Sequence, residues 1–224
     1  DKLDEQLDVL VSSLQENVDT NQLEDTNIHF QPEIPAEVFK EKVKTVQDYI
    51  DQGEALQIVI SQRMKAHFNG NPFTFYRKLR RANPSPYMFY IDFEDYMIIG
   101  ASPESLIQTS GEHVVTNPIA GTRARGKNAE EDLLLEKDLL EDRKEILEHD
   151  MLVDLSQQDL SHVCDKESIT VPTYMKVEKY QHVMHIVSEV HGKLKAGLSS
   201  IDALIACLPA GTVSGAPKAR AMQI

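Results

Sequence analysis

The order in which helical and strand patterns follow one another is what most restricts the fold of this 224-residue chain. Apolar residues recur at helical spacing over 35–53, 72–82 and 128–150, and short β-branched runs ending in turn residues lie between these helices. Helices and antiparallel hairpins are therefore interspersed, without the regular strand–helix alternation of a doubly wound sheet. The sequence predicts an α+β fold with antiparallel sheets.

Individual elements follow from the same patterns. The expected strands cover 55–61, 87–91, 96–100, 105–109, 114–118, 168–177 and 182–194, and a short helix is expected over 200–207. The helix over 128–150 is expected to be continuous and to bury a set of apolar side chains: Leu133, Leu134, Leu139, Leu140, Ile146 and Leu147.

The two ends of the chain are interpreted separately. Residues 1–33 are acidic, and Leu3, Leu7, Leu10, Val11 and Leu14 predict a first helix followed by a polar linker. Residues 34–224 are interpreted as part of one domain. The last residues lie inside a helical pattern that begins near Ala216, so we interpret the chain as a fragment.

The charge balance excludes some partners. With 23 basic and 36 acidic residues the formal charge is −13, which argues against nucleic acid and anionic membranes. Two cysteines, no apolar run long enough to cross a bilayer and no signal-peptide pattern indicate a reducing cytoplasm. An anionic substrate would need positive charge gathered locally.

Two glycine-containing segments are candidates for binding an anion. In 209–218, two glycines, two hydroxyls and a proline open a helix, so backbone N–H groups could point at a carboxylate. In 117–126, Gly121 and Gly126 flank two arginines, which suits carboxylate capture but equally describes a basic surface loop. An ordinary helix start remains the alternative for the first segment.

Acidic and histidine side chains supply further candidates. Glu145 and Glu148, three apart on a helix, share a face and present hard oxygen ligands that suit Mg²⁺, although such pairs are usually just solvated. Glu104 lies on a turn between strands, where catalytic groups are common. His182 and His185 would face opposite sides of a strand, which argues against a shared metal.

Taken in order, six segments of the chain carry a family resemblance. The segments are 57–63, 100–104, 118–122, 148–155, 182–188 and 209–218. From Pro35 to the end, the chain resembles the chorismate-utilising enzymes, which include anthranilate, aminodeoxychorismate, isochorismate and salicylate synthases. The resemblance implies two large antiparallel sheets packed between layers of helices, with chorismate as substrate and Mg²⁺ as cofactor.

The resemblance also implies roles for individual residues. Glu148 and Glu145 would hold Mg²⁺, Glu104 would be the general acid for the departing hydroxyl, and His182 would serve pyruvate elimination. The substrate would be bound by residues of the two glycine-containing segments: Ala120, Thr122, Gly211, Thr212 and Gly215.

Two positions point to the anthranilate-forming members of the family. Water-adding members carry a lysine base where this chain has Gln57, and an amide cannot deprotonate water. Aminodeoxychorismate synthases commonly carry a nucleophilic lysine where this chain has Ala120. The resemblance therefore implies ammonia addition, with ammonia from a glutamine amidotransferase partner, in tryptophan biosynthesis. The alternatives are an aminodeoxychorismate synthase component I and a non-catalytic fragment that only binds the amidotransferase.

Regulation and completeness are further expectations from the resemblance. The segment 83–89 is similar to one wall of a tryptophan feedback pocket, with Pro84, Tyr87 and Met88 as its candidate contacts. The family's second pair of metal-binding carboxylates is expected beyond Ile224, so the fragment alone is expected to be inactive. Gln157, Gln158 and Gln223 depart from the family pattern.

Overall fold

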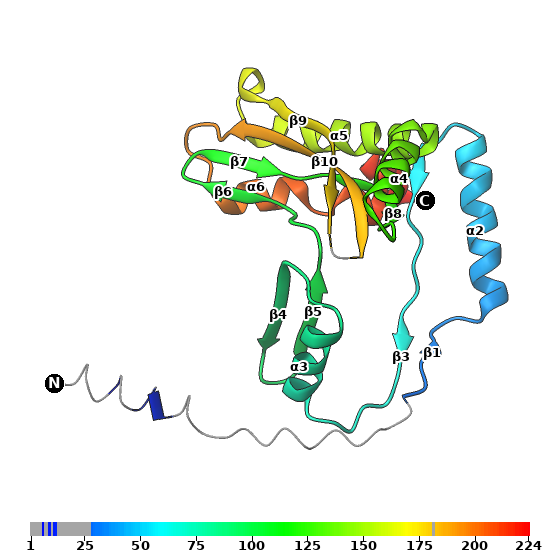
Figure 1. Cartoon of the computed structure of the whole chain (residues 1–224), viewed down its shortest axis with the longest axis vertical. Helices are drawn as coiled ribbons and strands as arrows, with labels where there is room; N and C mark the ends of the chain where they lie inside the picture. Colours follow the sequence, from blue (N-terminus) through cyan, green and yellow to red (C-terminus); the bar gives the residue numbers. More distant parts are fainter. Residues whose placement is uncertain (1–5, 7–8, 10, 13–27, 181) are drawn as a thin grey trace. The chain divides into compact units, whose positions relative to one another are not determined.

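A computed structural model describes residues 6, 9, 11–12, 28–180 and 182–224 (Figure 1). These residues form two compact units, one made of residues up to 31 together with 64–102, the other of 32–63 together with 103–224. The helix predicted near the N-terminus lies mostly outside the described residues, and the boundary between 33 and 34 stays a prediction. Within the described ranges, no helix is long and apolar enough to cross a membrane.

The helices and strands are numbered in chain order, and Figure 1 labels those for which there is room. The helices are α2 (Ala36–Asp51), α3 (Pro72–Ala82), α4 (Ala129–Glu141), α5 (Arg143–Val163), α6 (Ser200–Cys207), α7 (Gly211–Ser214) and α8 (Lys218–Gln223), with a 3-10 turn at Lys166–Ser168. The strands are β1 (Gln31–Pro32), β2 (Gln57–Ile58), β3 (Met64–Lys65), β4 (Tyr87–Asp92), β5 (Met97–Ser102), β6 (Gln108–Ser110), β7 (His113–Thr116), β8 (Ile119–Ala124), β9 (Thr170–Lys179), β10 (Val183–Lys193) and β11 (Gly215–Ala216).

The first unit contains α3 and the β4–β5 hairpin. Asn71 starts α3, because its side-chain oxygen accepts a hydrogen bond from the backbone N–H of Thr74 at 3.0 Å. The ring of Tyr90 on β4 contacts Phe73 and Tyr76 on α3, so aromatic packing holds the helix on the hairpin.

Strand β10 is the centre of the sheet in the second unit. One edge of β10 pairs with β9, and the other pairs with β8 and then β7, all antiparallel. Asn117 and Pro118 separate β7 from β8, and β6 pairs with β7. The long strands predicted over 168–177 and 182–194, and the antiparallel α+β fold, are confirmed.

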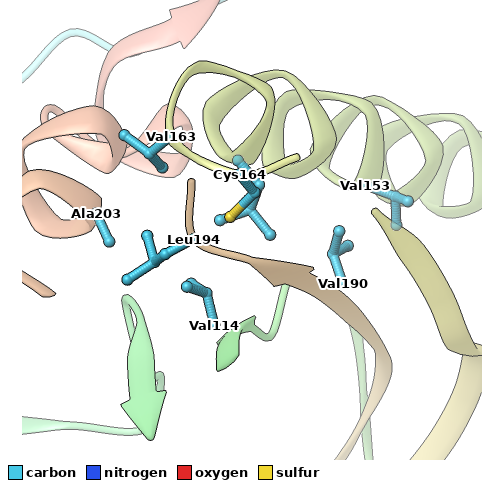
Figure 2. Packing of buried hydrophobic residues seen from close by; sticks show 8 residues of the cluster. Val114, Val153, Val163, Cys164, Val190, Leu194 and Ala203 are labelled. Atoms are coloured by element: carbon cyan, nitrogen blue, oxygen red, sulfur yellow. The ribbon is translucent and has the colours of Figure 1, made fainter. Parts of the chain in front are cut away.

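Helices α4 and α5 cover the buried face of β10. Met184, Ile186, Ser188 and Val190 alternate along β10 and are fully buried. Figure 2 shows the cluster in which β7, β10, α5 and α6 meet, formed with Leu160 by Val114, Val153, Val163, Cys164, Val190, Leu194 and Ala203. Burial of each larger aliphatic side chain contributes roughly 1.5–3 kcal/mol, so this cluster fixes α5 against the sheet.

The single helix predicted over 128–150 is wrong, since α4 and α5 are separate helices. Asp142 between them is extended (φ −73°, ψ 103°), and its side chain accepts a hydrogen bond from the backbone N–H of Lys144 at 3.0 Å. An aspartate bonded in this way starts a helix instead of continuing one. Leu139 is buried as predicted and Ile146 is half-buried, but the other predicted core residues are exposed: Leu133, Leu134, Leu140 and Leu147.

Three predicted strands are shorter or shifted. The run 55–61 contributes only β2, which pairs with the two-residue β11, and Leu56 beside it is 76% exposed. The runs 105–109 and 114–118 correspond to β6 and β7, each displaced by one or more residues. Apolar composition does not show where a run stops finding a hydrogen-bonding neighbour.

Candidate active site

A cavity in the second unit brings three of the predicted site residues together. Glu104 lies in the connection that leads to β6, and Gly211 and Thr212 form the first turn of α7. Leu155 of α5 closes one wall, because its Cδ1 lies 2.7 Å from where a Cβ on Gly211 would stand. The glycine therefore lets the α7 turn lie directly against α5.

The cavity changes the acidity of its titratable groups. Burial raises the pKa of Glu104 above its ordinary value, so the carboxyl holds its proton to higher pH. Burial likewise raises the pKa of the Cys207 thiol to about 11, so this cysteine stays protonated and unreactive near neutrality. A carboxyl that keeps its proton can act as a general acid.

A second cavity joins Gln57 and Glu148. Both residues are half-buried, and Leu56, Leu147 and Met151 complete the lining. Gln57 is placed by the pairing of β2 with β11, in which it lies opposite Ala216. Gln57, which is expected to select the nucleophile, and Glu148, which is expected to bind the metal, therefore line the same cavity.

Ala120 lines neither cavity but packs against residues that do. It is 8% exposed and belongs to a small cluster with Leu152, Leu155 and Ala216, against which Met151 packs. Met151 lines the second cavity, whereas Leu152 and Leu155 line the first, so consecutive turns of α5 form a wall of each.

The segment 117–126 is neither an anion-binding loop nor a basic surface loop, because it contains strand β8. Arg123 donates to Asp138 at 2.7 Å and to Asp142 at 2.8 Å, and lies 3.8 Å from Glu145. Arg125 is paired with Asp132. Acidic side chains on or just after α4 occupy both guanidinium groups, so the interpretation as a carboxylate-capture site is wrong.

The two histidines have different surroundings. The Nδ1 of His185 lies 3.0 Å from Thr122 Oγ1 and 3.1 Å from the carbonyl oxygen of Gly121, which ties β10 to β8. His182 is exposed, directly precedes β10 and lies outside both cavities. Thr122 is therefore engaged with His185, and neither residue joins the Glu104 cavity.

Gly215 has a structural reason to be glycine. Its φ is +138°, and a Cβ there would stand 2.2 Å from the carbonyl oxygen of Gln57. Its predicted contact with substrate stays a prediction. In the described part of the chain, no three His, Cys, Asp or Glu side chains converge as a metal site.

Sequence reasoning missed Asp159 and the placement of Lys218. Asp159 lines the Glu104 cavity and pairs with Lys218, the last residue of the candidate anion-binding segment 209–218. The only signal in the sequence was the spacing of Asp159, which places a carboxylate on the same face of α5 as Leu152 and Leu155.

The pair of Arg125 and Asp132 predicts a sensitivity to acid. The hydrogen bonds from Arg125 and from the backbone N–H of Gly126 lower the pKa of Asp132 from 3.8 to about 2. The lowered pKa of Asp132 stabilises the folded chain at pH values above the pKa of the unfolded chain, and this stabilisation is lost as the pH falls through the pKa of the folded chain.

We expect Asp132→Asn to lower the free energy of unfolding near neutral pH and to weaken the decline of that free energy from about pH 4 to 2. Urea unfolding followed by circular dichroism measures both, and Asp51→Asn, at an exposed position of α2, is the control. Identical pH profiles for the two variants would contradict the expectation.

The second unit is antiparallel α+β. Its first cavity is lined by an acid, Glu104, whose pKa is raised by burial, and by the Gly211–Thr212 turn, and its second cavity is lined by the carboxylate of Glu148. These are features of an enzyme that acts on a small anionic molecule. The chain belongs to the family of chorismate binding enzymes, and its residues 1–224 match the sequence model of that family. The resemblance based on the six segments is confirmed.

Named relatives narrow the comparison. Anthranilate synthase component 1 of Aquifex aeolicus is 53% identical over 188 residues, which are 84% of this chain and 38% of that protein. The protein of the same name from Lactococcus lactis is 50% identical over 198 residues, 88% of this chain and 43% of that protein. The crystal structure of anthranilate synthase component I from Streptococcus pneumoniae is similar with a TM-score of 0.88 and 45% identity, covering 99% of this chain and 49% of that chain. The chain thus spans about two fifths of the length of these curated relatives.

Proposed function

We propose that the whole protein converts chorismate to anthranilate, using ammonia supplied by a glutamine amidotransferase, in tryptophan biosynthesis. The observation that carries the proposal is the cavity joining Glu104 with Gly211 and Thr212. Its support is a sequence half identical to proteins named anthranilate synthase component 1.

The proposed reaction begins with addition of ammonia. A C–N bond forms at ring carbon 2, the ring double bonds shift, and the C–O bond at carbon 4 breaks. Glu104, whose pKa is raised by burial, gives its proton to the leaving oxygen, which departs as water, and the added nitrogen loses one proton to become the amine, so no net proton is consumed. Gly211 and Thr212 bind a substrate carboxylate beside it. Loss of a ring proton and of pyruvate then makes the ring aromatic, and His182 is the candidate residue for that half.

Glu145 and Glu148 fit a magnesium ion by donor type and spacing. Mg²⁺ takes hard oxygen ligands and is commonly held by one or two carboxylates, with water and substrate completing the set. Arg123 lies 3.8 Å from Glu145, whereas Glu148 faces the cavity of Gln57, so Glu148 is the main candidate ligand. When bound, the ion would neutralise the ring carboxylate of chorismate and orient the ring.

Tryptophan feedback through Pro84, Tyr87 and Met88 stays part of the proposal. These residues lie at the start of the β4–β5 hairpin in the first unit, where Tyr87 is 40% exposed and Met88 lies opposite Ala101.

The product formed from chorismate tests the proposed function. With chorismate, Mg²⁺ and ammonium, we expect the whole protein to release fluorescent anthranilate and pyruvate, and the 224-residue chain alone to release neither. Chromatography identifies the product. Aminodeoxychorismate in place of anthranilate would favour the alternative enzyme, which buried Ala120 argues against because it has no nucleophile. Absence of any amine product from the whole protein would overturn the proposal.

Gln57 is expected to select ammonia over water. In the whole protein, Gln57→Lys should add isochorismate as a minor product, because a partly desolvated lysine has a lowered pKa and can deprotonate water. Glu148 in the same cavity favours the charged lysine, which keeps the water product in the minority. Chromatography with and without ammonium measures both products, and Gln57→Met, similar in length but without a base, is the control. Anthranilate alone from Gln57→Lys at the wild-type rate would place Gln57 outside the reaction.

A further inference from the structure

One partly buried ion pair adjoins the Glu104 cavity without belonging to the proposed chemistry. Lys218 Nζ donates to Asp159 Oδ1 at 2.6 Å, to Asp159 Oδ2 at 2.5 Å and to the carbonyl oxygen of Cys207 at 3.2 Å. The side chains of Lys218 and Asp159 are 15% and 16% exposed. An ammonium has three N–H donors, and these three acceptors match that number, so Lys218 is not free to bind a ligand.

The pair joins three elements around one loop. Cys207 ends α6, Lys218 begins α8, and Asp159 lies on α5, so a single ammonium closes the two ends of 208–217 onto α5. The middle of this loop is the α7 turn with Gly211 and Thr212. Its far side is fixed by backbone hydrogen bonds to the β2 segment, from Leu56 N to Ala216 O at 2.8 Å and from Val59 N to Ser214 O at 2.9 Å.

The energetics favour a role in holding the loop over a role in general stability. A buried ion pair is often no more stabilising than an apolar pair of the same shape, because both ions lose their hydration. Its geometric restriction is strong, however, since a partly buried charge that moves from its partner is left without a full replacement by water. Burial raises the pKa of Asp159, and the hydrogen bond from Lys218 opposes this effect.

We propose, resting on the proposed function, that Asp159 and Lys218 are a positioning pair that holds the 208–217 loop so that Gly211 and Thr212 can bind the substrate carboxylate. A positioning role requires no contact of either side chain with substrate. The pair acts through the loop, so its loss should weaken chorismate binding much more than the chemical step.

Three variants of the whole protein test the pair: Lys218→Met, Asp159→Asn and the two combined. A positioning role predicts that each raises the chorismate KM roughly 10- to 100-fold, since small displacements of binding groups are costly, with kcat within about threefold of wild type. The combined variant should be no worse than either single one, because the interaction is already lost in each. Lys193→Met, which removes the exposed partner of Glu112 in the same unit, is the matched control.

Other roles give other patterns, each of which overturns the proposal. If Lys218 bound chorismate directly, Lys218→Met would raise KM while Asp159→Asn would not. If only the unpaired charge mattered, the combined variant would restore the wild-type KM. If KM were unchanged in all three variants, or if KM rose and kcat fell by the same factor, the pair would have no positioning role. Should Lys218→Met fail to fold, the combined variant still carries the test, because it buries no unpaired charge.

Hydrogen exchange of the backbone amides of 211–215 separates this inference from the proposed function. We expect exchange at these amides to rise at least about tenfold in the combined variant relative to Lys193→Met, because the loop opens locally. If the wild-type protein did not convert chorismate, the proposed function would be overturned. The exchange rates alone would then decide whether Asp159 and Lys218 hold the loop. Unchanged exchange would overturn the positioning role.

Discussion

Glu104→Gln is expected to lower the kcat of the whole protein roughly 10²–10⁴-fold, with chorismate binding much less affected. The amide keeps the shape of the side chain but has no proton to give to the leaving hydroxyl. Steady-state kinetics with chorismate and ammonium measures both constants. Glu112→Gln, the same substitution at an exposed turn, is the control, and a Glu104→Gln kcat within a few-fold of wild type would make Glu104 only a turn residue.

The same substitution should stabilise the fold near neutral pH. Burial raises the pKa of Glu104 in the folded chain, so the carboxyl favours the folded state below its unfolded pKa and loses that advantage as the pH rises through its folded pKa. The amide does not titrate. We therefore expect the variant to gain stability over wild type as the pH rises above the ordinary carboxyl range, and to show no gain in acid. Thermal unfolding at several pH values measures this; a loss of stability near neutral pH would show that Glu104 supports the fold.

Gly215→Ala is expected to destabilise the 224-residue chain by roughly 2–4 kcal/mol, combining overpacking with backbone strain. The added methyl would stand 2.2 Å from the carbonyl oxygen of Gln57 and 2.8 Å from Ala221 Cβ, and a backbone atom cannot swing aside as a long side chain does. Because β11 carries the partner of Gln57, the second cavity should open as well. Urea unfolding gives the stability.

Gly197→Ala separates strain from collision. Gly197 also has a positive φ, 84°, but an added Cβ there meets nothing within 4 Å. We expect it to cost only about 1 kcal/mol, the cost of placing a side chain in the left-handed region. Equal losses for Gly197→Ala and Gly215→Ala would show that the contact with Gln57 carries no weight.

Sequence patterns identified the elements whose signals are local. The β9 and β10 strands and helices α3 and α6 occur where alternation, caps and turn residues predicted them. The break at Asp142 was missed because the apolar spacing continues across it, and only the bonds of its side chain to the backbone reveal the cap. Leu133 and Leu134 have helical spacing but are exposed, since spacing shows a shared face and not what covers that face.

Candidate site residues were predictable mainly through the order of the motifs. That order named Glu104, Gly211 and Thr212, which the structure places around one cavity, and Gln57 and Glu148, which share another. It could not show that Arg123 is neutralised by Asp138 and Asp142, because ion pairs between distant segments leave no mark in the spacing of either. Roles in the reaction stay predictions.

The residues of the site that lie on α5 depend on one another for their position around the helix axis. Glu145, Glu148, Leu152, Leu155 and Asp159 follow one another at steps of three and four residues, so at about 100° per residue they fall on one narrow stripe. One face of α5 consequently supplies the proposed metal ligands, part of the wall of each cavity and the anchor of the 208–217 loop. Removing a single residue near Met151 would turn everything after it by about 100° and shorten the stripe by about 1.5 Å, taking Asp159 away from Lys218 while leaving Glu148 in place. The length of this helix is therefore as restricted as the identity of the residues on it.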